Sequence, residues 1–205
     1  MKPKKNNALI TLTQTAIMAA LCYVGFEFFQ IPIALPSGTV AVHLGNVFCV
    51  LAALLLGGVY GGMAGAIGMT LADLLDPRYI TSAPKTFVLK LGIGLICGLV
   101  AHRIGGITRP AADGSEKPRK TVALWCVLGC SAGLVFNIIF EPIVSYLYQR
   151  FLLGQAADAA MILAKWQAAA TLINAVIAVV TATLLYMALH PALDKAGVLR
   201  RDIRF

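Results

Sequence analysis

The sequence predicts an all-α integral membrane protein of six transmembrane helices, which forms one membrane domain over residues 1–205. The first observation is composition: 59% of the 205 residues are hydrophobic, only 13% are charged, and the mean hydropathy is +0.82. A soluble domain of this length needs more polar residues to cover its surface. The second observation is that apolar runs of roughly 16 to 25 residues recur along the chain, and about 20 apolar residues cross a hydrocarbon core as a helix.

The number of spans depends on how the apolar stretch over residues 39–75 is divided. As one helix it would be about 55 Å long, which is too long for a single crossing. The segment 57–62 (GGVYGG) lies in its middle, and glycine runs break helices. We therefore predict two short spans joined by a tight turn. The six expected spans are about residues 9–29, 40–56, 60–75, 86–104, 121–146 and 166–189.

The basic residues support this count. They form three groups: Lys2, Lys4 and Lys5; then Arg103, Arg109, Lys117, Arg119 and Lys120; and finally Lys195, Arg200, Arg201 and Arg204. The positive-inside rule places such groups in the cytoplasm. Six spans put all three groups on one side, with both termini and the loop 105–120 cytoplasmic, whereas five spans do not.

Several other classes of function are disfavoured by the sequence. The net charge of +8 comes from chain ends and one loop rather than from a basic helix face with aromatics, so we expect no nucleic-acid partner. Zinc-protease, nucleophile-elbow and P-loop motifs are missing, and we expect no enzyme activity and no cofactor. The five cysteines lie inside apolar runs, so we expect neither a metal site nor a disulfide.

Ionisable and amide groups inside membrane spans are expensive and usually functional. In the six-span topology they gather in the outer half of the bundle. The candidate ligand-binding residues there are Glu27, Asp73, Lys90, Asn137, Glu141, Trp166 and Asn174. Some could instead form internal salt bridges, for instance Asp73 with Lys90. We assign Lys85, Lys165 and Gln167 to the headgroup region at least as readily as to a site.

Two outer loops, residues 30–38 and 76–84, could cover this polar region as a lid. The first contains Pro32, Pro36 and Gly38 and no charge. His43 and Asn46 follow it directly and complete the candidate ligand-binding set, although a single histidine is often structural.

Residues 42–48 (VHLGNVF), 54–57 (LLLG), 61–75 (GGMAGAIGMTLADLL) and 83–90 (APKTFVLK) resemble the substrate-binding S components of energy-coupling-factor (ECF) transporters. The similarity is greatest to the riboflavin, hydroxymethylpyrimidine and pyridoxine group. Over the last two spans it is one of topology alone. The resemblance implies six helices with both termini inside and a pocket near the outer face, as the span count also predicts.

The resemblance further implies partners and a location. An ECF transmembrane coupling subunit and two ATPase subunits would drive uptake of a small-molecule substrate across the lipid bilayer of a prokaryotic plasma membrane. Small residues of the first span would dock the coupling subunit, here Ala16, Ala19 and Ala20. A small-xxx-small pattern by itself is common in packed membrane helices.

The substrate stays open at this point. Glu141 with Glu27 and Asp73 suggests a ligand with a cationic or multi-donor edge, such as a pyrimidine, pyridine or deazapurine carrying an amino or aminomethyl group. Riboflavin is less favoured, and a queuosine precursor is an alternative. Two other classes remain, a free-standing secondary transporter and a membrane enzyme that uses the outer carboxylates.

Overall fold

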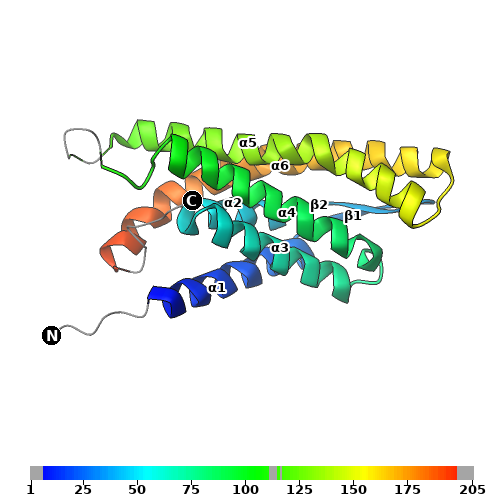
Figure 1. Ribbon diagram of the computed structural model, residues 1–205, viewed down its shortest axis with the longest axis horizontal. Helices are drawn as coiled ribbons and strands as arrows, with labels where there is room; N and C mark the ends of the chain where they lie inside the picture. Colours follow the sequence, from blue (N-terminus) through cyan, green and yellow to red (C-terminus); the bar gives the residue numbers. More distant parts are fainter. Residues whose placement is uncertain (1–6, 111–114, 116, 198–205) are drawn as a thin grey trace.

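The computed structural model describes residues 7–110, 115 and 117–197. Figure 1 shows an elongated helical bundle with a β-hairpin lying along it. We call the end of the bundle where α1 finishes and α4 begins the hairpin end, and the opposite end the terminal end. The basic residues Lys2, Lys4, Lys5, Arg200, Arg201 and Arg204, on which part of the topology prediction depends, lie outside the described residues.

The described residues form six α-helices, which make up the bundle. They are α1 (Asn7–Glu27), α2 (Gly45–Leu56), α3 (Gly58–Leu75), α4 (Ala83–Gly98), α5 (Arg119–Leu147) and α6 (Ala157–Lys195). Shorter helical turns precede α4 as η1 (Ile80–Ser82), extend α4 as η2 (Leu99–Ile104) and extend α5 as η3 (Tyr148–Leu152). Within the described residues, all of these helices except α2 belong to segments long and apolar enough to cross a membrane. The membrane-helix fold class is thus confirmed.

Residues 30–43 form a β-hairpin, which the sequence did not predict. Strands β1 (Gln30–Leu35) and β2 (Gly38–His43) pair antiparallel, with Gln30 opposite His43 and Leu35 opposite Gly38. The expected second span at residues 40–56 therefore starts too early, because its first four residues belong to β2. The apolar run had hidden the β-branched residues of 38–43, which favour a strand.

Helix α2 is a central helix rather than an independent crossing. Its 12 residues span about 18 Å, less than the hydrocarbon thickness. Every residue of α2 except Phe48 is buried, as expected for a helix that is apolar on all sides. At its end Gly57 has φ 91°, a conformation that glycine adopts at little cost. This is the tight turn predicted between the second and third spans.

Glycine allows α3 to pack closely against its neighbours. A Cβ at Gly94 or Gly98 of α4 would collide with the backbone of Gly62 or Gly58 in α3. Close backbone approach through small residues is the usual way in which membrane helices pack. It holds the terminal-end halves of α3 and α4 together, and the opposite halves of the same two helices carry Asp73 and Lys90.

Helix α6 is longer than the expected span at residues 166–189. It begins at Ala157 and ends at Lys195, so its 39 residues reach about 58 Å. The polar group at residues 165–167 looked like the start of a span, but it lies within the helix. The other spans lie within a few residues of their expected positions.

Candidate functional site

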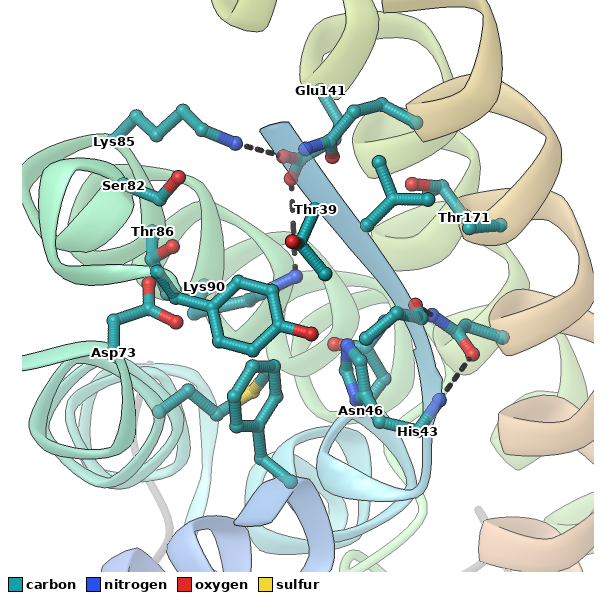
Figure 2. A pocket seen from close by; sticks show the side chains of 18 residues that line it. Thr39, His43, Asn46, Asp73, Ser82, Lys85, Thr86, Lys90, Glu141 and Thr171 are labelled. Carbon is teal, nitrogen blue, oxygen red and sulfur yellow. Dashed lines mark hydrogen bonds and ion pairs between the residues drawn. The ribbon is translucent and has the colours of Figure 1, made fainter. Parts of the chain in front are cut away.

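A cavity lies inside the hairpin end of the bundle, between β2 and helices α1 to α6 (Figure 2). Its free volume is about 60 Å³, which is room for only a few water molecules. The lining residues come from every helix and from β2. They are Phe26, Thr39, Val40, Ala41, His43, Asn46, Met69, Asp73, Tyr79, Ser82, Lys85, Thr86, Lys90, Glu141, Gln167, Ala170, Thr171 and Asn174.

Four buried charged side chains line the cavity. Lys85 Nζ lies 2.6 Å from Glu141 Oε1, and Lys90 Nζ lies 3.9 Å from Glu141 Oε2. The first distance is that of a charge-assisted hydrogen bond, whereas the second is too long for one. Asp73 is 2% exposed, and its Oδ2 has no hydrogen-bond partner among the described residues. Two ammonium groups and two carboxyl groups therefore balance in formal charge.

His43 adds a neutral ring to this cluster. Burial and, to a smaller extent, the nearby Lys90 ammonium lower the pKa of His43 to about 3, and Glu141 opposes this shift. The backbone N–H of Gly45 donates to His43 Nδ1 at 3.1 Å. In a neutral imidazole one nitrogen accepts and the other donates. The proton is therefore on Nε2, which is available as a donor.

Aromatic rings form another part of the lining. Phe26 contacts His43 and Tyr79, with ring centroids 4.7 and 5.4 Å apart. Burial raises the pKa of Tyr79 to about 12, so its hydroxyl stays protonated. That hydroxyl has no partner in the described part of the chain. These rings offer an apolar surface beside the charged cluster, which suits a flat ligand with a polar edge.

Asn174 of α6 attaches the hairpin to the bundle. Its Oδ1 accepts a hydrogen bond from the backbone N–H of His43 at 2.9 Å, and its Nδ2 donates to the carbonyl of Ala41 at 3.2 Å. At the other end of the hairpin, Gln155 Nε2 donates to the carbonyl of Ser37 at 3.2 Å. The hairpin thus lies along α6 and covers one side of the cavity, as a lid would.

The loop after α3 is held by a local ion pair. Asp76 accepts hydrogen bonds from the side chain and backbone of Arg78. The Arg78 side-chain hydrogen bond lowers the pKa of Asp76, and burial opposes this shift. The pair tightens the turn that places the neighbouring Tyr79 against Phe26.

The cavity brings together six of the nine predicted ligand-binding residues: His43, Asn46, Asp73, Lys90, Glu141 and Asn174. The other three lie elsewhere. Glu27 is the last residue of α1, Asn137 is buried one turn along α5 from Glu141, and Trp166 is 44% exposed on α6. That the six residues contact a ligand remains a prediction.

Sequence reasoning left Lys85 and Gln167 open between the headgroup region and a site, and did not include Tyr79 or Thr86 among the candidates. All four line the cavity. For Thr86 the signal was available, because it lies four residues before Lys90 on one helix, where side chains share a face. Lys85 lies five residues before Lys90, a spacing that predicts no shared face. For Tyr79 the sequence held no signal, since a loop brings it inward.

The three predicted docking residues on α1 differ in their surroundings. Ala16 and Ala20 are exposed, whereas Ala19 is partly buried and packs against α3. A Cβ added at Gly68 of α3 would collide with the Ala19 carbonyl. Ala19 thus belongs to an internal contact. Ala16 and Ala20 lie on the exposed face of α1, and their docking role stays a prediction.

The described residues contain no group of three or more His, Cys, Asp or Glu side chains that could hold a metal ion. The five cysteines are buried free thiols. The chemistry of the cavity is therefore that of ammonium, carboxyl, hydroxyl, amide and aromatic groups.

A membrane bundle that encloses a small polar cavity near one end is typical of a membrane protein that binds a small solute. The model of the family described as ECF-type riboflavin transporter, S component, matches residues 6–191. The chain belongs to this family, and the resemblance seen in residues 42–90 is confirmed. The family is a substrate-binding component of a transporter, and not an enzyme family.

Two solved structures share the fold. One is ThiT from Listeria monocytogenes, which is 20% identical with a TM-score of 0.62 and covers 92% of this chain and 98% of its own. The other is the S-component for biotin from an ECF-type ABC transporter, at 20% identity and a TM-score of 0.55, with 89% and 93% covered. No curated protein matches the chain significantly.

Proposed function

We propose that this chain is the substrate-binding subunit of an ECF-type, ATP-driven importer that takes up a vitamin or a related small heterocycle. The observation that carries the proposal is the buried cavity with balanced charges beside an aromatic surface. Burying charged and hydrogen-bonding groups inside a membrane bundle is costly, so such groups are usually functional. Membership of the S-component family supports the same function.

The cavity favours a substrate without net charge. Glu141 is paired with Lys85, so a cationic amine would have to displace a buried ammonium group to reach it. An anionic substrate would be repelled by the carboxylates of Asp73 and Glu141. A neutral planar heterocycle can instead donate to Asp73 Oδ2 and accept from Lys90. This reasoning shifts the expectation away from the aminomethyl-bearing rings inferred from the sequence.

Riboflavin is the first substrate to test, because the family carries its name and its ring system is planar and uncharged. Neutral pyrimidines, pyridines and deazapurines, including a queuosine precursor, are the alternatives. The free volume of about 60 Å³ means that the cavity must widen for any of them. We propose that the hairpin moves to allow this.

In the proposed orientation the hairpin end faces the outside of a prokaryotic plasma membrane, and both termini are cytoplasmic. The basic groups of the sequence support this orientation. Single cysteines at Ser115 and Asp158, in a cysteine-free background, test it with an impermeant thiol reagent. Asp158→Cys should be labelled in intact cells, and labelling of Ser115→Cys from outside would reverse the topology.

The proposed partners are an ECF transmembrane coupling subunit and two ATPase subunits. The test is riboflavin uptake by proteoliposomes that contain this chain alone, the coupling module alone, or both. We expect ATP-dependent uptake only with both. Uptake by the chain alone down an ion gradient would favour a secondary transporter, and chemical conversion of the ligand by the chain would favour an enzyme.

A further inference from the structure

Basic side chains gather at the terminal end of the bundle, where η2 ends and α5 begins (Figure 1). Residues 103–120 contain five basic and two acidic side chains, so this segment has a formal charge of +3. The two acidic residues, Asp113 and Glu116, lie outside the described residues. Arg103 and Arg109 are exposed. This end of the molecule therefore presents a positive surface, far from the substrate cavity.

Two of these cations are held next to one another. Lys117 Nζ donates to the carbonyls of Gly105 and Gly106, at 2.8 Å each. Gly106 has φ 55°, a conformation that favours glycine. A Cβ built on Gly106 would lie 3.0 Å from Lys117 Nζ and 3.6 Å from Arg109 Cδ. The side chains of Lys117 and Arg109 therefore pack over the same glycine.

Such a pair of like charges is suited to binding an anion between them. The two carbonyls occupy two of the three N–H groups of the Lys117 ammonium, so one donor and the positive charge remain. Among the described residues, ion pairs with carboxylates are formed by Arg78, Lys85 and Lys90 and by neither of these two cations. A phosphate matches the pair, because a guanidinium can bind two phosphate oxygens and an ammonium adds a point charge.

The neighbouring apolar residues indicate that the phosphate belongs to a lipid. Ile104 is 61% exposed and Leu124 is 56% exposed, on either side of the basic segment. The indole of Trp125 lies directly against Gly105, since a Cβ there would collide with it. Tryptophan is typical of the headgroup level of a membrane. This surface thus offers cations to a headgroup and apolar side chains to acyl chains, and a free phosphate would use only the cations.

We propose that Arg109 and Lys117 bind the phosphate of an anionic phospholipid at the terminal end of the bundle. Arg103 adds to the attraction, and Ile104 and Leu124 contact the acyl chains. Basic side chains at the ends of membrane helices are a common means of binding acidic headgroups. The lipid site lies at the opposite end of the bundle from the cavity, so this inference does not depend on which substrate the cavity takes.

The chain has two tryptophans, and this allows a direct test. Trp166→Phe gives a parent chain in which Trp125, next to the proposed site, is the single indole. The full-length parent is placed in phosphatidylcholine vesicles that contain increasing fractions of brominated phosphatidylglycerol or brominated phosphatidylcholine. Bromine quenches an indole on contact, so the two quenching curves give the preference of the site for an anionic lipid.

The site variants are Arg109→Gln and Lys117→Gln in the same parent. Lys195→Gln is the matched control, because Lys195 is exposed at the end of α6 and carries the same charge at the same end of the bundle. We expect the parent to prefer phosphatidylglycerol about 10-fold, and each site variant to lower this preference about 3- to 5-fold. The control should keep the preference of the parent.

Melting temperatures in detergent without anionic lipid separate binding from folding. Arg109→Gln should melt with the parent, whereas Lys117→Gln should melt lower, because Lys117 also holds two backbone carbonyls. The Arg109 variant therefore tests the site without a change in stability.

Equal quenching by the two brominated lipids in the parent would overturn the site. Equal losses in Arg109→Gln and Lys195→Gln would also overturn it, since they would show a diffuse attraction to the whole basic end. If Arg109→Gln keeps its lipid preference but no longer co-purifies with the coupling subunit, the basic surface binds a protein and the lipid site is wrong.

Discussion

At the scale of single residues, the cavity depends on how its charges are paired. Glu141 has two lysine neighbours, at 2.6 Å and 3.9 Å. Removing one partner of a buried ion pair leaves an uncompensated charge and is strongly destabilising. The sequence suggested Lys90 as the partner of a buried carboxylate, Asp73. The geometry instead gives the direct hydrogen bond to Lys85.

This arrangement predicts that substituting Glu141 destabilises the protein more than substituting Lys85. Glu141→Gln leaves both lysines without this carboxylate and should cost about 3–5 kcal/mol. Lys85→Met should cost less, because Lys90 still lies near Glu141. Thermal unfolding of the ligand-free protein in detergent measures both, with the exposed Lys165→Met as a control that should change nothing. Equal losses, or none for Glu141→Gln, would contradict the pairing.

His43 predicts a pH dependence of stability. Its pKa is about 3 in the folded protein and about 6.5 when unfolded. Between these values the unfolded state binds more protons, so stability is complete above about pH 6.5 and falls as the pH decreases toward 3. At pH 5.5 the loss should be about 1.4 kcal/mol.

His43→Gln retains an acceptor for the Gly45 N–H and cannot titrate, so it is the matched variant for this prediction. Melting temperatures of both proteins at pH 7.5 and pH 5.5 provide the measurement. The wild type should lose more stability than the variant over this range. Identical pH profiles would show that His43 is not buried as a neutral ring.

At the scale of elements, the sequence predicted the helices better than the hairpin. Long hydrophobic runs are a strong signal for membrane helices. The predicted break at GGVYGG corresponds to the turn at Gly57 between α2 and α3. The same signal cannot show where a buried strand ends and a buried helix begins, so β2 was included in a span. Likewise, the polar residues 165–167 were taken for a boundary, although inside the bundle Gln167 faces the cavity.

The hairpin should be held mainly by Asn174. Asn174→Ala removes the two side-chain hydrogen bonds to β2. The residues next to His43 in the sequence cannot form these two bonds instead. We expect hydrogen exchange in peptides covering residues 30–43 to rise at least several-fold, with exchange in α2 and α3 unchanged. Gln155→Ala is the comparison at the turn and should affect residues 36–38 alone. Unchanged exchange in both variants would show that apolar contacts with Leu163 hold the hairpin.

Helix α1 gives a prediction about coupling. Ala16→Trp and Ala20→Trp place a large ring on the exposed face, so the isolated chain should stay folded and bind ligand. Both should fail to co-purify with the coupling subunit, and uptake should cease. Ala19→Trp is the contrast, since Ala19 packs against α3 and the ring should destabilise the chain itself. Normal assembly and uptake by the Ala16 and Ala20 variants would place the docking surface elsewhere.

At the scale of the whole molecule, the bundle brings residues from each of the helices α1 to α6 to one cavity. The convergence of polar groups at one end could be predicted, because the span count assigns each residue to a side. The specific partners could not, since Lys85 and Glu141 are 56 residues apart and meet only through the packing of α4 with α5. Asn137 shows the limit of the helical-face argument, because it shares the face of Glu141 and yet lies beyond the cavity lining.

The central claim is that this cavity is the substrate site, and direct binding to the purified chain tests it. The measurement is the riboflavin Kd of the wild type, Asp73→Asn and Lys90→Met, with the exposed Asp158→Asn as control. Losing a hydrogen bond to a charged group should weaken binding about 10- to 150-fold in the two cavity variants and leave the control unchanged. Riboflavin binding that is as tight in both folded cavity variants as in the wild type would contradict the claim.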